Sequence, residues 1–154
     1  MALREKDIRT GLYTPGFLVA FGAREFAFAR ENGYPLSLLT VNIGGIDEDG
    51  DPEIVYEDFR KLAERLREEA GEGSIVGQLS DDEIVVLLPG TPPEKARRIA
   101  DKITRAMESI ERFSSMVSSG RIFIRLSSTD DGHSEFKDLL YAGQQQDINT
   151  NTVL

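Results

Sequence analysis

Three consecutive acidic residues, Asp81, Asp82 and Glu83, follow Ser80 between two short apolar runs. The runs, residues 74–79 and 84–88, predict two paired strands, so the acidic residues would stand at the tip of a tight hairpin. Carboxylates on a rigid tip can bind a metal ion or contact a phosphate. An acidic turn that is merely solvated is the structural alternative, and this pattern alone leaves both interpretations open.

Other elements of the chain must hold this tip in place. The strand at 84–88 is continuously apolar, so we expect it to be central and covered on both faces. A second apolar run at 36–43, stopped by Gly44 and Gly45, predicts another strand. A third strand at 121–126 alternates polar and apolar residues, which predicts an edge position with one face in water.

Caps and apolar spacing predict four helices, one before the strands, two between them and one after them. We expect helices from Thr14-Pro15 to Gly33, from Asp51-Pro52 to Gly71, from a capping box at Thr91-Pro92-Pro93-Glu94 onward, and from Ser134 through Leu140. The serine-rich stretch 113–120 is interpreted as a connector.

Beyond the first helix, the order of elements is the split β-α-β-β-α-β pattern. This order predicts an α/β (α+β) fold resembling polymerase and nucleotide-cyclase palms, in which helices flank a central sheet rich in antiparallel pairs. A right-handed crossover would insert strand 84–88 between the other hairpin strand and strand 36–43. Asn42 and Ile43 would then lie beside the acidic tip.

Length and composition limit the classes of protein to which the chain could belong. The 154 residues predict one domain, with a lead-in at 1–13 and a loosely ordered tail at 144–154. A net charge of −9 argues against nonspecific binding to nucleic acid. No apolar run is long enough to span a membrane, no cysteine is present and no signal-peptide core is visible, so we expect a cytoplasmic protein.

Two further sites are unpromising as metal centres. The acidic stretch 47–53 resembles a calcium loop, but Pro52 stands where an EF-hand needs glycine and a strand precedes it. His133 is the single histidine, which excludes a histidine cluster and predicts a surface imidazole.

Three separated motifs together resemble the GGDEF domain of bacterial diguanylate cyclases. The segment Asp7-Ile8-Arg9-Thr10-Gly11-Leu12-Tyr13 is similar to the family's opening D-x-L-T-G-L-Y, and 34–39 is similar to its entry into the first strand. Ser80-Asp81-Asp82-Glu83-Ile84 and the following 85–91 resemble the signature G-G-D-E-F and the A-V-L-L-P-G-T after it. The resemblance covers essentially the whole chain.

The resemblance implies a domain that binds GTP with two divalent metal ions such as Mg²⁺. Two such domains face each other to make cyclic di-GMP. Carried over by position, the metal ligands would be Asn42, the Ile43 carbonyl and Asp82. Asp82 and Glu83 would be the catalytic positions, and Ser80 and Asp81 would lie against the nucleotide.

The sequence departs from the family at most of these positions. Asn42 and Gly44 replace aspartates, and Ser80 and Asp81 replace the two glycines that let backbone approach the phosphates. The loop carrying the guanine contacts is about three residues short. The inhibitory R-x-x-D motif would fall on 71–74, where Gly-Glu-Gly-Ser stands, and 143–149 offers no secure counterpart of the phosphate-binding lysine.

Two hypotheses follow from these departures. The first, which the sequence favours, is a degenerate GGDEF domain of a bacterial signalling protein, without cyclase activity, that regulates or dimerises. Such a domain would have no resident cofactor, would bind GTP weakly with Mg²⁺ or not at all, and would pair with a second copy or with other signalling domains. The second is an active, divergent cyclase or a GTP-binding or GTP-hydrolysing domain that uses Asp82 and Glu83, with Asp81 as a further candidate.

Overall fold

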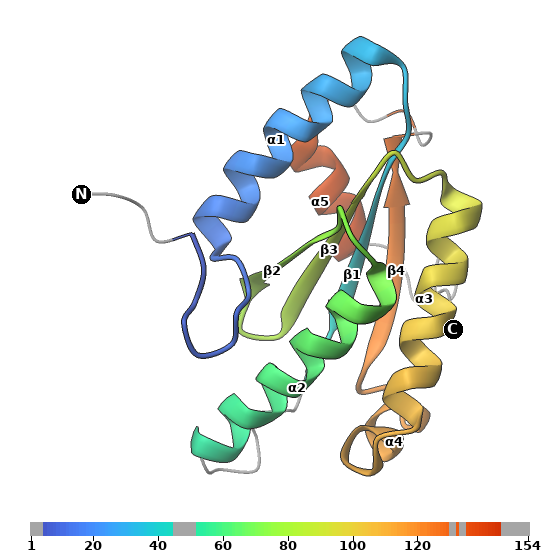
Figure 1. Cartoon of the computed structure of the whole chain (residues 1–154). Coiled ribbons are helices and arrows are strands. Elements are labelled where there is room, and N and C mark those ends of the chain that lie inside the picture. The colour runs from blue at the N-terminus through green and yellow to red at the C-terminus, as the bar shows by residue number, and fades with distance from the viewer. Residues whose placement is uncertain (1–4, 45–51, 130–131, 133–134, 146–154) are drawn as a thin grey trace.

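An antiparallel sheet in the order β2-β3-β1-β4 separates two layers of helices (Figure 1). The computed structural model describes residues 5–44, 52–129, 132 and 135–145. The strands are β1 Leu36–Asn42, β2 Ile75–Ser80, β3 Glu83–Pro89 and β4 Phe123–Ser128. The helices are α1 Pro15–Asn32, α2 Pro52–Ala70, α3 Pro93–Glu108, α4 Glu111–Ser118 and α5 Phe136–Gln145.

The strand pairing confirms the predicted topology. β3 lies between β2 and β1 and is antiparallel to both, and β4 pairs with the other side of β1. The β1–β3 register runs from Leu36 opposite Pro89 to Asn42 opposite Glu83. The end of β1 and the hairpin tip therefore share one end of the sheet.

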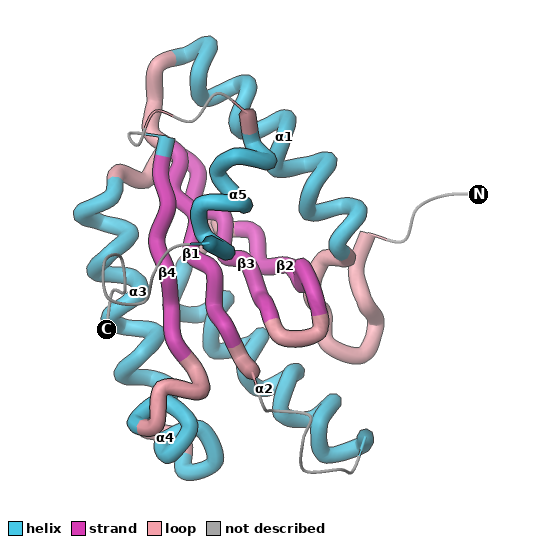
Figure 2. Tube along the Cα trace, turned by 180° about the vertical axis from the view of Figure 1, so that it is seen from behind, coloured by secondary structure: helices cyan, strands magenta, loops and turns pink. Residues whose placement is uncertain are grey.

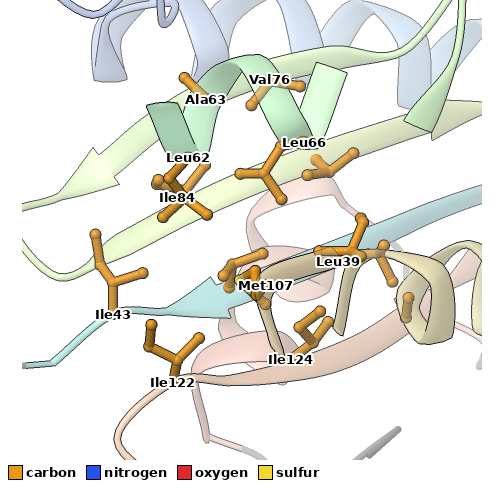
Figure 3. Close-up of a cluster of buried hydrophobic side chains, with 14 of the residues drawn as sticks. Leu39, Ile43, Leu62, Ala63, Leu66, Val76, Ile84, Met107, Ile122 and Ile124 are labelled. Carbon is orange, nitrogen blue, oxygen red and sulfur yellow. The ribbon is translucent and has the colours of Figure 1, made fainter. Parts of the chain in front are cut away.

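Alternating side chains of β1 supply two separate cores. Leu39 and Val41, with Ile43 directly after the strand, belong to the larger core together with residues of α2 and α3. Figure 3 shows Leu39 and Ile43 in this cluster. Leu36 and Leu38 point the other way, where α1 and α5 cover the sheet (Figure 2). Because each fully buried leucine contributes roughly 1.5–3 kcal/mol, β1 is stabilised from both sides.

The start and end of α1 and the span of α2 agree with the sequence. Pro15 opens α1, and Gly33 ends it with φ 70°, a left-handed conformation that glycine adopts without strain. Thr14 occupies the N-cap position without a side-chain capping bond. Helix α2 runs to Ala70, directly before Gly71.

The stretch 113–120 is not a connector, and this prediction was wrong. Residues 111–118 form α4, with Phe113, Met116 and Val117 buried on one side at helical spacing. The Ser118 hydroxyl lies 3.2 Å from the Ser114 carbonyl, so serine bonds back to the helix rather than breaking it. The many serines of this stretch suggested a loop, although its apolar residues have the spacing of an amphipathic helix.

Two local predictions at the other helices and strands were also wrong. Pro92, not Thr91, is the N-cap of α3, and its ring has no polar atom that could cap the helix. The Thr91 hydroxyl donates instead to the Pro89 carbonyl at 3.2 Å. β4 is an edge strand, as predicted, but its polar face is only partly open to water, since Phe123 and Arg125 are half-buried and Ser127 is buried. Helix α5 packs there, and the buried Ser127 hydroxyl donates to the Leu139 carbonyl at 3.0 Å.

Several predictions fall outside the described residues. These are the calcium-like stretch up to Asp51, the His133 imidazole, the Ser134 cap and the tail from residue 146. Within the described ranges, the helices are too short or too polar to cross a bilayer.

Gly22 tests the packing of α1 against α5. A Cβ at Gly22 would collide with the Phe136 ring, whereas a Cβ at Gly16 would meet nothing within 4 Å. We expect Gly22→Ala to lower the free energy of unfolding by about 1–3 kcal/mol through overpacking. Gly16→Ala should be neutral or raise it by up to about 1 kcal/mol. Urea unfolding followed by circular dichroism measures both, and equal effects would contradict the tight α1–α5 contact.

Candidate functional site

The hairpin tip and the end of β1 form one continuous polar corner. Asn42 pairs with Glu83, and the Ile43 N–H donates to the Asp82 carbonyl at 2.8 Å. The predicted site residues on β1 and on the hairpin are thus brought together, although about forty positions separate them in the sequence. This backbone hydrogen bond fixes the position of the turn relative to the end of β1.

The turn itself is shorter than the sequence suggested. Ser80 pairs with Glu83, so only Asp81 and Asp82 lie outside the strands, and both side chains are exposed. Tight hairpins usually need positive φ at the turn, but neither aspartate has it. The register shifts between Gln78 and Ser80, so the pairing of β2 with β3 is irregular next to the turn.

The Ser80 hydroxyl holds the two carboxylates that follow. Its oxygen lies 3.0 Å from Asp82 Oδ1 and 2.8 Å from Glu83 Oε1. A hydroxyl has one proton to donate, so the two carboxylates compete for the same bond. The tip is therefore organised by its own side chains, at the position where a glycine would leave backbone open to a ligand.

The position of Asn42 fits a metal ion poorly. Its Oδ1 accepts the Gly44 N–H at 3.1 Å, and its other amide atom is a donor that cannot ligate a cation. Magnesium sites depend on carboxylates, and the amide carries no charge. Among the residues that the structure describes, no three His, Asp or Glu side chains gather to hold a metal. The residues present do not fit a two-metal centre.

The lead-in segment is held against the hairpin by backbone bonds. The Asp7 carboxylate accepts the Arg9 and Thr10 N–H groups at 2.8 and 3.3 Å, which shapes a turn ending at Gly11. Tyr13 then bridges to β2, where its carbonyl accepts the Gln78 N–H at 2.9 Å. The opening motif thus lies beside the strand that leads into the tip.

Arg67 of α2 reaches this turn and was missed in the sequence. Its guanidinium Nη1 donates to the Gly11 carbonyl at 3.3 Å, and a Cβ at Gly11 would press on that guanidinium. Gly11 has φ 75°, which favours glycine. Nothing local in the sequence indicated this contact, because the two residues are 56 positions apart.

A polar cavity of about 330 Å³ lies between the lead-in and the start of α2. The Arg9 guanidinium stands 4.4 Å from the centroid of the Tyr56 ring, a cation–π contact. Arg60 forms ion pairs with Glu57 and with Glu64, and its hydrogen bond lowers the pKa of the Glu57 carboxyl. The cavity is lined by Arg9, Glu53, Tyr56, Glu57 and Arg60, and no motif in the sequence pointed to them.

The positions of the expected inhibitory motif form only a connection. Gly71 and Gly73 both have positive φ, and the Ser74 hydroxyl donates to the Gly71 carbonyl at 2.7 Å. The segment turns the chain from α2 into β2. It presents none of the arginine and aspartate that R-x-x-D would supply.

Solved structures with this arrangement are known from several bacteria. The GGDEF domain of FimX from Pseudomonas aeruginosa has a TM-score of 0.78 at 18% identity, covering 93% of this chain and 91% of that one. The GGDEF domain of DgcB from Caulobacter crescentus, solved in complex with c-di-GMP, has a TM-score of 0.75 at 15% identity, with 94% and 88% covered. The active GGEEF domain of a diguanylate cyclase from Vibrio cholerae has 0.72 at 19%, with 86% of each covered.

At identities this low, the TM-scores establish a shared fold and nothing further. No curated protein matches the chain. The family model described as "Diguanylate cyclase, GGDEF domain" matches residues 55–144, a stretch that holds most of α2, the hairpin, α3, α4, β4 and most of α5. More than half of the chain is matched, and the element order and the position of the hairpin agree with it, so the chain belongs to the GGDEF domain family.

Proposed function

We propose that this domain makes no cyclic di-GMP and serves as a regulatory or dimerising module in a bacterial signalling protein. The observation that carries the proposal is the polar corner at Asn42, where an amide stands in place of a carboxylate and already accepts the Gly44 N–H. The fold that would position a cyclase site is intact. The proposal concerns the side chains on it.

Loss of the first metal ligand weakens the chemistry most. In two-metal phosphoryl transfer, carboxylates hold the ions and help to neutralise charge that develops in the transition state. Here Asp82 retains a carboxylate, but it shares the Ser80 hydroxyl with Glu83. A single aspartate beside a neutral amide supports weak metal binding and leaves a two-metal centre incomplete.

Asp81 opposes nucleotide binding through its charge. The side chain is exposed at the turn, directly before Asp82. A triphosphate brought to the tip would meet this carboxylate, and Coulomb repulsion near a protein surface reaches about 4 kcal/mol for unit charges 4 Å apart at an effective dielectric constant of 20. Repulsion of this size, even when partly screened, supports GTP binding no tighter than millimolar.

An alternative is a domain that still binds GTP with Mg²⁺, with or without chemistry. Asp82 and Glu83 are retained and lie at the corner, which favours this alternative. The polar cavity beside Tyr56 could also take part of a nucleotide. Enzyme assay and binding measurements separate the two functions.

In the enzyme assay, the purified chain incubated with GTP and Mg²⁺ or Mn²⁺ should form no cyclic di-GMP above background. The expected result follows from Asn42, Ser80 and Asp81, which replace an aspartate and two glycines of the family pattern. Chromatography of the nucleotides measures the product. Cyclic di-GMP that appears with the natural chain and disappears with Asp82→Ala would overturn the proposal.

Thermal unfolding tests whether nucleotide binding survives. At millimolar GTP, a millimolar site adds RT ln 2, roughly 0.4 kcal/mol, and shifts the Tm by about 1–2 °C. A micromolar site would add about 4 kcal/mol and shift it on the order of 10 °C. We expect the small shift or none. A large shift that needs Mg²⁺ and is lost in Asp82→Ala would establish the alternative, a nucleotide sensor.

A carboxylate restored at position 42 tests the metal site. Asn42→Asp should bind Mn²⁺ more tightly than the natural chain, on the order of tenfold, because it places a second carboxylate beside Asp82. Titration calorimetry measures the affinity, and Asn42→Ala is the matched control without a ligand. Equal Mn²⁺ affinity in all three proteins would show that Asn42 does not limit the metal site.

A further inference from the structure

The side of α1 that faces away from the sheet is apolar over most of its length. The helix lies at the periphery of the molecule in both views (Figure 1, Figure 2). Its inner side packs on α5 and β2, and the buried residues there are Leu18, Gly22, Phe26 and Ala29. The exposed residues opposite them, which we call the outer face of α1, are Ala20, Arg24, Ala27, Phe28 and Glu31.

The apolar character of this helix is unusual for a surface position. A surface helix normally turns polar and charged side chains to water. On α1, Phe28 is 55% and Val19 is 43% exposed. The rings of Tyr13, Phe17 and Phe21 stack beside the outer face, with centroids 4.6 and 5.5 Å apart, and extend the apolar surface along one flank. A helix that is apolar on every side is normally covered by other protein.

Two charged residues, Arg24 and Glu31, stand within this apolar surface. The residues three and four positions from Arg24 are all alanine or phenylalanine, and so are those three and four positions before Glu31. Neither side chain forms an ion pair with any residue that the structure describes. The other charged residues of α1, Glu25 and Arg30, point to its flanks, so the helix is neutral on a chain of net −9.

The spacing of the two charges makes the outer face complementary to itself. Arg24 and Glu31 are seven residues apart, which is about 10.5 Å along one side of the helix. An antiparallel copy of α1 presents the same charges in the reverse order, so each Arg24 would meet the partner's Glu31. Ala27 lies between the two charges, and its small side chain lets the helices approach closely. A parallel copy would bring like charges together.

We propose that the outer face of α1 binds the same face of a second copy of the chain, in an antiparallel pair with two-fold symmetry. The pair covers Ala20, Ala27 and Phe28 and gives both charges a partner. It rests on the dimerising part of the proposed function and supplies a surface for it. No residue of the polar corner takes part, so the contact is independent of the chemistry at Asn42 and Asp82.

The length of α1 limits the strength of the pair. Its 18 residues extend about 27 Å. One pair of helices of this length reaches at most the lower end of the roughly 1,200–2,000 Å² that stable interfaces bury. We therefore expect a weak dimer, with a Kd on the order of 100 μM. At about 0.15 M salt, the charge on the rest of each copy is largely screened beyond about 8 Å.

Sedimentation equilibrium between about 10 μM and 1 mM chain tests the pair. Arg24→Glu and Glu31→Arg should each weaken dimerisation about tenfold or more, because each substitution brings like charges together at two places. An equimolar mixture of the two variants should dimerise as tightly as the natural chain, because every contact in the mixed pair again joins opposite charges. Circular dichroism confirms that each variant is folded.

Arg98→Glu is the matched control. It makes the same change of net charge as Arg24→Glu at an exposed position of α3, on the other side of the sheet, and should leave dimerisation unchanged. Glu31→Arg lowers the net negative charge of the chain and should still weaken the pair. General repulsion between two acidic chains would have the opposite effect.

Three results would overturn the inference. One is a natural chain that stays monomeric over the whole range, which would leave α1 to a different partner. Another is a dimer that Arg24→Glu weakens no more than Arg98→Glu does, which would place the contact on another face. The last is a mixture of the two variants that does not regain the affinity of the natural chain. Because none of these substitutions touches the polar corner, the assay for cyclic di-GMP tests the proposed loss of cyclase activity separately.

Discussion

The antiparallel pairing of β1 with both β3 and β4 is the constraint on which the rest of the molecule depends. Residues 36–41 are buried on both faces and hydrogen-bonded on both edges. A one-residue slip would exchange the side chains of the two cores, because alternate residues point to opposite faces. The register that places Asn42 opposite Glu83 is thus set by leucine packing far from the corner.

The same constraint explains how a family scaffold can persist while the side chains at its polar corner vary. The two cores draw on β1, β3 and the covering helices, and neither uses the side chains of Asn42, Ser80, Asp81 or Asp82. Replacement of these polar residues therefore removes no contact from either core. Packing of the two cores sets where the polar corner lies, whereas a few side chains at that corner set what it can bind.

The sequence predicted the parts of the structure that follow from local periodicity. Both central strands, the hairpin, α1 and α2 were found because apolar spacing and caps mark them. Helix α4 was missed because its serines suggested a connector, although Phe113, Met116 and Val117 carried the helical pattern. The contacts of Arg67 with Gly11 and of Arg9 with Tyr56 could not be predicted, because their partners are distant in sequence and meet only through tertiary packing.

The bridge between Tyr13 and β2 has a consequence for solubility. β2 is an edge strand, and unpaired edges can recruit strands from other molecules into aggregates. The Tyr13 N–H and carbonyl occupy the Val76 carbonyl and the Gln78 N–H at 3.1 and 2.9 Å. The lead-in therefore covers part of the exposed edge of β2. A few residues of backbone are enough to occupy hydrogen-bonding groups that could otherwise pair with a strand of another molecule.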